Sequence, residues 1–145
     1  MVTGFGKQTT TGWHPLLSGT HELARAIADP VHDGLAWRER VASRLRGLRG
    51  AFDEHMRATE GPAGHYAALV DSAPRLALGV SGLVREHTDV LDRIRALQEH
   101  VDEGRPGTEE IQAWARLLVH QIFAHRQRGA DLVLEAYHTD LGGSD

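Results

Sequence analysis

The sequence predicts an all-α protein whose helices form an antiparallel, up-down four-helix bundle. Three observations predict this fold class. Apolar residues recur with a period of about 3.5 to 3.6 residues through most of the chain, and no stretch alternates apolar and polar residues as a half-buried strand would. Four such segments are separated by short connections rich in glycine and proline. Helices joined by short links pack as antiparallel neighbours.

The first helix is expected to cover about Pro15 to Ala28. Proline suits the opening turn of a helix, and Asp29-Pro30 would end it. The preceding residues contain glycine and threonine but neither the charged start nor the apolar centre of a signal peptide. We therefore expect a flexible N-terminal arm over residues 1–12, one bundle domain over residues 13–145, and a cytoplasmic protein.

The second and third helices each show one continuous apolar face that includes a histidine. The second helix ends at Gly61, and its inner face is spaced alternately by four and three residues: Val41, Leu45, Leu48, Phe52, His55 and Thr59. A short helical turn is expected over residues 65–70. The third helix is expected to begin near Ser72, an N-cap residue type, and to end at Glu103-Gly104. Its expected inner face is Leu76, Val80, Leu83, His87, Val90 or Leu91, Ile94 and Leu97.

The fourth helix is expected to begin at Thr108 and to end near Leu141. Thr108 is a capping residue type, and Glu109 and Glu110 suit the positive end of the helix dipole. The expected inner face is Ile111, Trp114, Leu118, Ile122 (or Gln121), His125, Gly129, Leu132 and Ala136.

One histidine therefore falls on the expected inner face of each helix. From His87 to the end of its helix is 16 residues, and from Thr108 to His125 is 17. At about 1.5 Å per residue, His87 and His125 are expected at nearly the same height on neighbouring helices. His55 is expected to join them. For the fourth histidine, His14 and His21 of the first helix are candidates, with His32 in the following connection as a third, and we favour His21 because it lies inside the helix.

Composition narrows the classes of function. The net charge of −4 offers no basic surface for nucleic acid, and the apolar runs are too short to span a bilayer. The absence of cysteine removes thiolate metal sites and thiol catalysis. Ten histidines are the one unusual count. We expect no nucleic-acid or membrane partner, and a monomer or homodimer.

Three segments of the sequence are distinctive in their order and spacing: Phe52-Asp53-Glu54-His55, Ala73-Pro74-Arg75-Leu76 leading to Arg85-Glu86-His87, and the segment from His125 to Tyr137. In these segments the chain resembles the hemerythrin-like (HHE cation-binding) proteins, and the similarity extends over most of its length after the N-terminal arm. The resemblance implies a four-helix bundle that holds two non-haem irons through histidines and two bridging carboxylates. It would make His21, His55, His87 and His125 the imidazole ligands.

The sequence departs from that family where the bridging carboxylates are expected, four or five residues after a histidine. Thr59 stands four residues after His55, with Glu60 at the next position as a substitute ligand, and Gly129 stands four residues after His125. One bridge or both are therefore absent. Two divalent ions need anionic bridges because neutral imidazoles cannot screen their repulsion. Thr59 and Gly129 would also leave a pocket beside the metal.

These residues lead to three hypotheses. The first is a mononuclear, histidine-rich metal site that binds O2 or NO, or supports a redox or oxygen-dependent reaction on a small molecule; iron is expected first, and zinc or copper also suit imidazole. The second places a haem between the histidines. The third is an interaction module with vestigial histidines. Enzyme status stays open.

Glu54 and Glu86 directly precede His55 and His87. Adjacent residues of a helix point about 100° apart, so the side chain of each glutamate is expected to interact with a group on a neighbouring helix.

Overall fold

The computed structural model describes residues 2–104 and 107–142, with side chains from residue 14 to residue 138 apart from 105–106. The described chain is helical and contains no strand, which confirms the all-α class. Four long helices are joined by short connections, and the second connection carries a short helix and a 3-10 turn. In chain order these elements are α1 (Val2–Ala28), α2 (Gly34–Glu60), α3 (His65–Ser72), η1 (Pro74–Leu76), α4 (Ala77–Glu103) and α5 (Thr108–Gly142).

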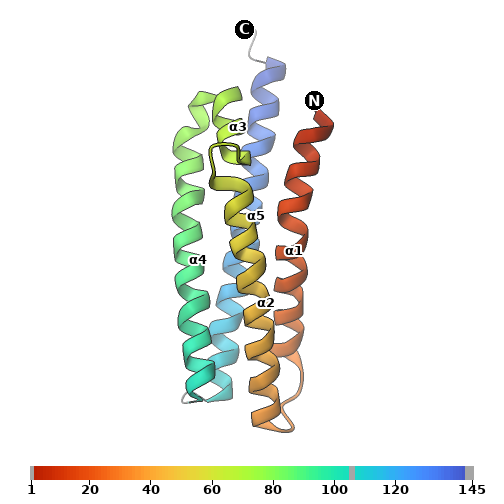
Figure 1. Ribbon diagram of the computed structural model, residues 1–145, viewed down its shortest axis with the longest axis vertical. Helices are drawn as coiled ribbons and strands as arrows, with labels where there is room; N and C mark the ends of the chain where they lie inside the picture. The colour runs from red at the N-terminus through yellow and green to blue at the C-terminus, as the bar shows by residue number, and fades with distance from the viewer. Residues whose placement is uncertain (1, 105–106, 143–145) are drawn as a thin grey trace.

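The four long helices lie side by side along the long axis of the molecule (Figure 1). The α1–α2 and α4–α5 connections lie at one end, and α3 with η1 lies at the other (Figure 1). α1 packs against α2 and α5, and α4 packs against the same two helices. The interior of the molecule is therefore lined by one face from each long helix.

Helix α2 follows from its local sequence. Asp33 adopts an extended conformation and its carboxylate accepts hydrogen bonds from the backbone N–H groups of Leu35, at 3.0 Å, and Ala36, at 3.4 Å. The predicted inner face is buried along its whole length, from Val41 to Thr59. The predicted inner face of this helix is therefore confirmed. It could be predicted because the period of 3.6 residues determines which side chains share one face of a helix.

Three expected boundaries or faces differ in the structure. α1 begins at Val2 rather than near Pro15, so it extends into residues 1–12, whose side chains lie outside the described part of the chain. α4 begins at Ala77 rather than near Ser72. Ser72 is the last residue of α3, and its hydroxyl donates a hydrogen bond to the carbonyl of Leu69.

The third difference lies in α5. Trp114 was expected on the inner face, but it is 38% exposed and its ring lies 4.9 Å from that of His100, whereas Ala115 is fully buried. Position 115 is four residues before Val119 and three before Leu118, and both of these are buried. The small alanine therefore holds the inward position, and the larger tryptophan covers the edge of the helix contact.

The apolar core consists of two clusters that meet at the level of three histidines. The larger cluster includes Phe52 and Val90, and the smaller one, next to α3, includes Tyr66 and Leu83. Along α4, His87 stands between Leu83 of the smaller cluster and Val90 of the larger one. The polar level is thus enclosed by apolar packing above and below.

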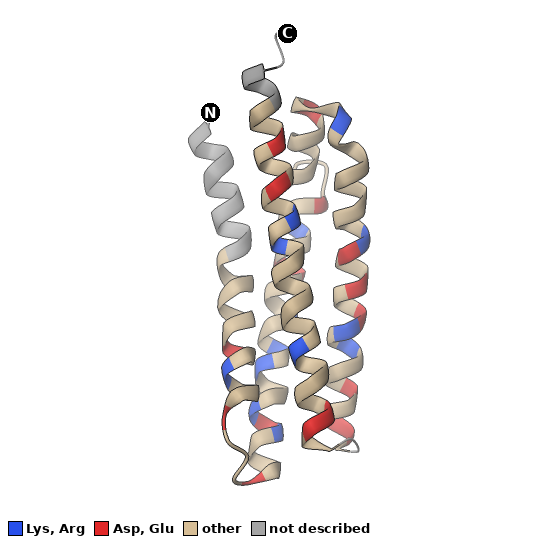
Figure 2. Ribbon diagram, turned by 180° about the vertical axis from the view of Figure 1, so that it is seen from behind, with Lys and Arg blue, Asp and Glu red and all other residues tan. Residues whose placement is uncertain are grey.

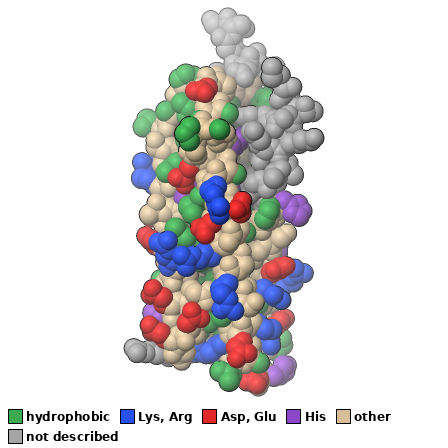
Figure 3. All heavy atoms as spheres, in the orientation of Figure 1, with side chains coloured by type: hydrophobic (Ala, Val, Ile, Leu, Met, Phe, Trp, Pro, Cys, Tyr) green, Lys and Arg blue, Asp and Glu red, His purple; other side chains and the backbone are tan. Residues whose placement is uncertain are grey.

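The outer surface carries charges of both signs. Basic and acidic residues are interspersed on the described helices (Figure 2), and the face shown in Figure 3 also carries both. Within the described residues, no helix taken alone is long and apolar enough to cross a bilayer; only the bent pair Gly34–Ser72 with Pro74–Glu103 meets the length and composition criteria, and only jointly.

Candidate metal centre

Three imidazoles from three different helices meet in the interior. His55 of α2, His87 of α4 and His125 of α5 are each no more than 1% exposed. Their ring centroids are separated by 4.9 Å, 5.5 Å and 4.7 Å, and one ligating atom from each lies within 4.8 Å of the others. The Nε2 atoms of His55 and His125 are 3.4 Å apart. The predicted equal height of His87 and His125 is confirmed.

Phe52 closes the side of the cluster that faces the larger apolar core. The centroid of its ring lies 5.8 Å from that of His55, which follows Phe52 by one turn of α2. It lies 5.5 Å from the ring centroid of His87, and these two rings meet edge to face. Because Phe52 is completely buried, it excludes water from that side. The rotations of the three imidazoles are therefore restricted by packing as well as by polar contacts.

Two carboxylates hold the outer nitrogens of two of the imidazoles. Oε2 of Glu60 lies 2.5 Å from Nδ1 of His87, and Oε1 of Glu86 lies 2.6 Å from Nδ1 of His125. A carboxylate accepts a hydrogen bond, so each Nδ1 carries the proton and each Nε2 keeps its lone pair. This is the arrangement in which proteins orient histidines that ligate metals.

The carboxylate of Glu86 is itself held in place. Its second oxygen, Oε2, lies 2.5 Å from Nε of Arg128, one turn after His125 on α5. Glu86 therefore bridges a buried imidazole and a half-exposed guanidinium. The ion pair fixes the carboxylate, and through it the ring plane of His125.

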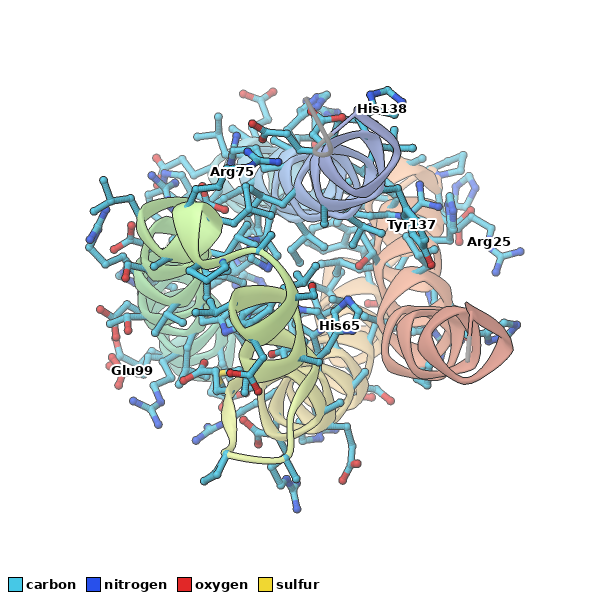
Figure 4. All side chains as sticks on the ribbon, turned by 90° about the horizontal axis from the view of Figure 1, so that it is seen from above. Arg25, His65, Arg75, Glu99, Tyr137 and His138 are labelled. Carbon is cyan, nitrogen blue, oxygen red and sulfur yellow. The ribbon has the colours of Figure 1, made fainter. Side chains whose placement is uncertain are left out.

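Tyr66 of the short helix α3 completes the cluster. Its hydroxyl oxygen lies 3.2 Å from Nε2 of His87, and the two rings are stacked with centroids 5.6 Å apart. Since Nδ1 of His87 donates to Glu60, its Nε2 is the acceptor and the phenol donates to it. The sequence-based prediction did not include Tyr66. The neighbouring His65 is also buried and lies inside the ring of helices when the molecule is viewed from the α3 end (Figure 4).

Burial sets the protonation of these groups. It lowers the pKa of His87 to about 3, with a further contribution from the nearby His125. It also lowers the pKa of His125, although Glu86 opposes the shift, and it raises the pKa of Tyr66 above its usual range. Both imidazoles are therefore neutral near pH 7, the form that ligates a metal, and the phenol is protonated.

His21 is not brought to the other three histidines. It is exposed on α1, where its ring lies 5.3 Å from that of Phe123. The buried stripe of α1 runs through Leu16, Thr20, Leu23 and Ile27, so His21 is turned about 100° past the inward position of Thr20. The alternatives His14 and His32 are exposed as well. The expectation that the first helix points a histidine inward is therefore not met.

The remaining predicted residues take other positions. Glu60 contacts the outer nitrogen of His87 and is not among the three groups that converge. Thr59 is buried, and its hydroxyl donates to the carbonyl of His55 at 2.8 Å. Gly129 is half-buried on α5. Glu54 is exposed and pairs with Arg57 on its own helix.

Comparison of the chain with models of known protein families, with curated proteins and with solved structures finds no match in any of the three.

Proposed function

We propose that the protein binds one transition-metal ion through the Nε2 atoms of His55, His87 and His125. The observation that carries this proposal is the convergence of three buried imidazoles, two of which are oriented by carboxylates on their outer nitrogens. With metal–nitrogen bonds near 2.1 Å, adjacent ligands of one ion lie about 3.0 to 3.4 Å apart at octahedral or tetrahedral angles. The 3.4 Å between Nε2 of His55 and Nε2 of His125 fits one shared ion.

A single ion fits this donor set better than two. Glu60 and Glu86 face the outer nitrogens of their histidines and do not bridge the centre. Two dications held only by neutral imidazoles would repel each other without compensation. The charge of one dication would be balanced by these two carboxylates, which contact the histidines rather than the ion. Imidazole suits iron, zinc, copper and nickel alike, and the hemerythrin-like resemblance puts iron first.

The proposed function is that of a hemerythrin-like protein with an up-down antiparallel bundle and an atypical, mononuclear site. The alternation of the helix connections between the two ends supports this topology (Figure 1). Three protein ligands leave at least one coordination position for an exogenous molecule. O2 and NO are the exogenous ligands that we propose, and the wider class of function is a redox or oxygen-dependent reaction on a small molecule.

A haem fits the site less well. The three imidazole rings pack edge to face, and a porphyrin between any two of them would displace the third.

Metal analysis of protein purified without a histidine tag tests the proposal. After incubation with Fe(II) under anaerobic conditions, or with Zn(II) or Cu(II), and removal of free metal, we expect close to one metal per chain. His55→Ala and His125→Ala should lose that metal. His21→Ala is the matched control and should retain it, because His21 is exposed outside the cluster.

Two results would contradict the proposal. One is wild-type protein that retains none of the three metals. The other is equal loss of metal in His21→Ala and His55→Ala, which would indicate surface binding. Wild-type protein without metal, whose thermal stability is unchanged by metal or chelator, would instead favour an interaction module with vestigial histidines.

A further inference from the structure

We infer that Tyr66 is a fourth protein ligand of this metal centre, with its phenol oxygen bound to the ferric ion beside His87. This inference rests on the proposed function and specifies its ligand set. Tyr66 is outside the histidine pattern of the sequence and comes from α3, the one α-helix of the described chain that is too short to run along the bundle.

The first argument is distance. The phenol oxygen lies 3.2 Å from Nε2 of His87. That separation falls in the range of about 3.0 to 3.4 Å expected between adjacent ligands of one ion with bonds near 2.1 Å. The two nitrogens of His55 and His125 are related in the same way, at 3.4 Å. One ion can therefore contact Nε2 of His87 and the oxygen of Tyr66 without a change in either backbone.

The second argument concerns the lone pair of His87. Its Nδ1 proton is committed to Glu60, so the only lone pair on the ring is at Nε2, and the phenol now donates to it. A metal at Nε2 takes that lone pair, so the phenol loses this hydrogen bond while its oxygen stays beside the ion. The contact between the Tyr66 and Thr59 side chains remains and keeps the phenol oxygen at the site.

The third argument is that the phenol cannot turn away from the site. Tyr66 is 5% exposed and packs with Leu69, Leu76 and Leu83 in the smaller apolar cluster. Its ring is also stacked on the imidazole of His87. The oxygen is therefore held at the centre by packing, which lowers the entropic cost of ligation.

The bond has a simple balance. The phenol O–H proton is released to solvent, the oxygen–iron bond forms, and neither partner changes its oxidation state. Iron(III) favours this step because an anionic oxygen is a hard ligand. An iron(III)–phenolate pair also has a visible charge-transfer absorption, which histidine ligands alone do not produce.

The chain has two tyrosines, so the assignment can be made with two variants. Iron is supplied as the Fe(III) citrate complex, free complex is removed, and bound iron and the visible spectrum are measured together. We expect the charge-transfer band in the wild type and in Tyr137→Phe, and its loss in Tyr66→Phe. The Tyr66→Phe ring keeps its apolar contacts, and its circular dichroism and thermal unfolding will show whether the variant is folded.

The possible failures are distinguishable. If wild-type protein retains iron without the band, or if the band persists in Tyr66→Phe, the role of Tyr66 is overturned while the histidine site stands. The same holds if zinc or copper is retained but iron(III) is not. If no metal is retained at all, the proposed function fails and this inference fails with it.

Discussion

Glu86 of α4 holds the imidazole of His125 on α5, with 2.6 Å between Oε1 and Nδ1, and not that of His87, which follows it directly in sequence. Adjacent residues of a helix point about 100° apart. When His87 points to the interior, Glu86 therefore faces the neighbouring helix. One dipeptide of α4 supplies both an inward imidazole and the partner of a second imidazole.

The Glu86–His125 pair predicts that Glu86→Gln weakens metal binding by about 10- to 100-fold. Glutamine still offers an oxygen to Nδ1 of His125, but it loses the negative charge and the ion pair with Arg128. Titration with Zn(II) against a competing chelator measures the change. Glu54→Gln is the control, because Glu54 and its partner Arg57 are mostly exposed. Equal affinities of Glu86→Gln and the wild type would exclude this role.

The buried histidines predict that the metal-free protein loses stability in acid. Burial lowers the pKa of His87 to about 3 and also lowers the pKa values of His125 and His65, so below about pH 6.5 the unfolded chain binds protons that the native state excludes. The free energy of unfolding should then fall with decreasing pH between about 6.5 and 3, by up to about 1.4 kcal/mol per pH unit for each histidine. The raised pKa of Glu60 opposes this trend.

Urea unfolding in the presence of chelator, measured at several pH values between 7.5 and 4, checks this dependence. His87→Leu removes one of the three groups and should show a shallower decline of stability with falling pH. A stability that does not change over this range, or an identical slope in the variant, would show that these imidazoles are accessible to protons in the native state.

The sequence predicted the angular position of His55, His87 and His125, and the height of the last two. Both depend on local information: the spacing along α2 determines which face His55 shares, and counting from the α4–α5 connection determines the heights of His87 and His125. Thr59 was also predicted inward and is buried. Periodicity and rise per residue are constant in helices, so these quantities need no knowledge of tertiary packing.

The contacts made across the bundle could not be predicted in this way. Tyr66 contacts His87 because α3, in the connection between α2 and α4, packs beside the three histidines. No local sequence pattern predicts that placement of α3. α1 was ambiguous for a different reason: both Leu17 with Ala24 and Leu16 with Leu23 form plausible inward stripes. Packing selected the stripe with Leu16 and Leu23, which left His21 outside.

Trp37 should be the tryptophan that matters most for stability among those whose side chains are described. It is completely buried, and its indole N–H donates to the carbonyl of Ala26 at 3.1 Å, which joins the start of α2 to the end of α1. Trp37→Ala should lower the free energy of unfolding by about 3–5 kcal/mol. Trp114→Ala, at a partly exposed site, should cost no more than about 1 kcal/mol. Urea unfolding followed by circular dichroism measures both, and similar losses would contradict the assigned core.

Two glycines at different places in the helices should respond to alanine with opposite signs. Gly104 ends α4 with φ +69° and donates its N–H to the carbonyls of His100 and Val101. Alanine is strained in that left-handed conformation, so Gly104→Ala should destabilise the protein by about 1–2 kcal/mol. Gly47 lies inside α2, and an added Cβ would meet no atom within 4 Å.

Gly47→Ala should therefore stabilise the protein by about 0.4–1 kcal/mol, because alanine lowers the entropy of the unfolded chain and favours the helix. Thermal unfolding of the two single variants and of the double variant measures the effects. The sites are far apart in the sequence and make no shared contact among those described, so their effects should add. A stabilising Gly104→Ala would show that α4 does not end in a left-handed residue, and a destabilising Gly47→Ala would place that position in a helix contact.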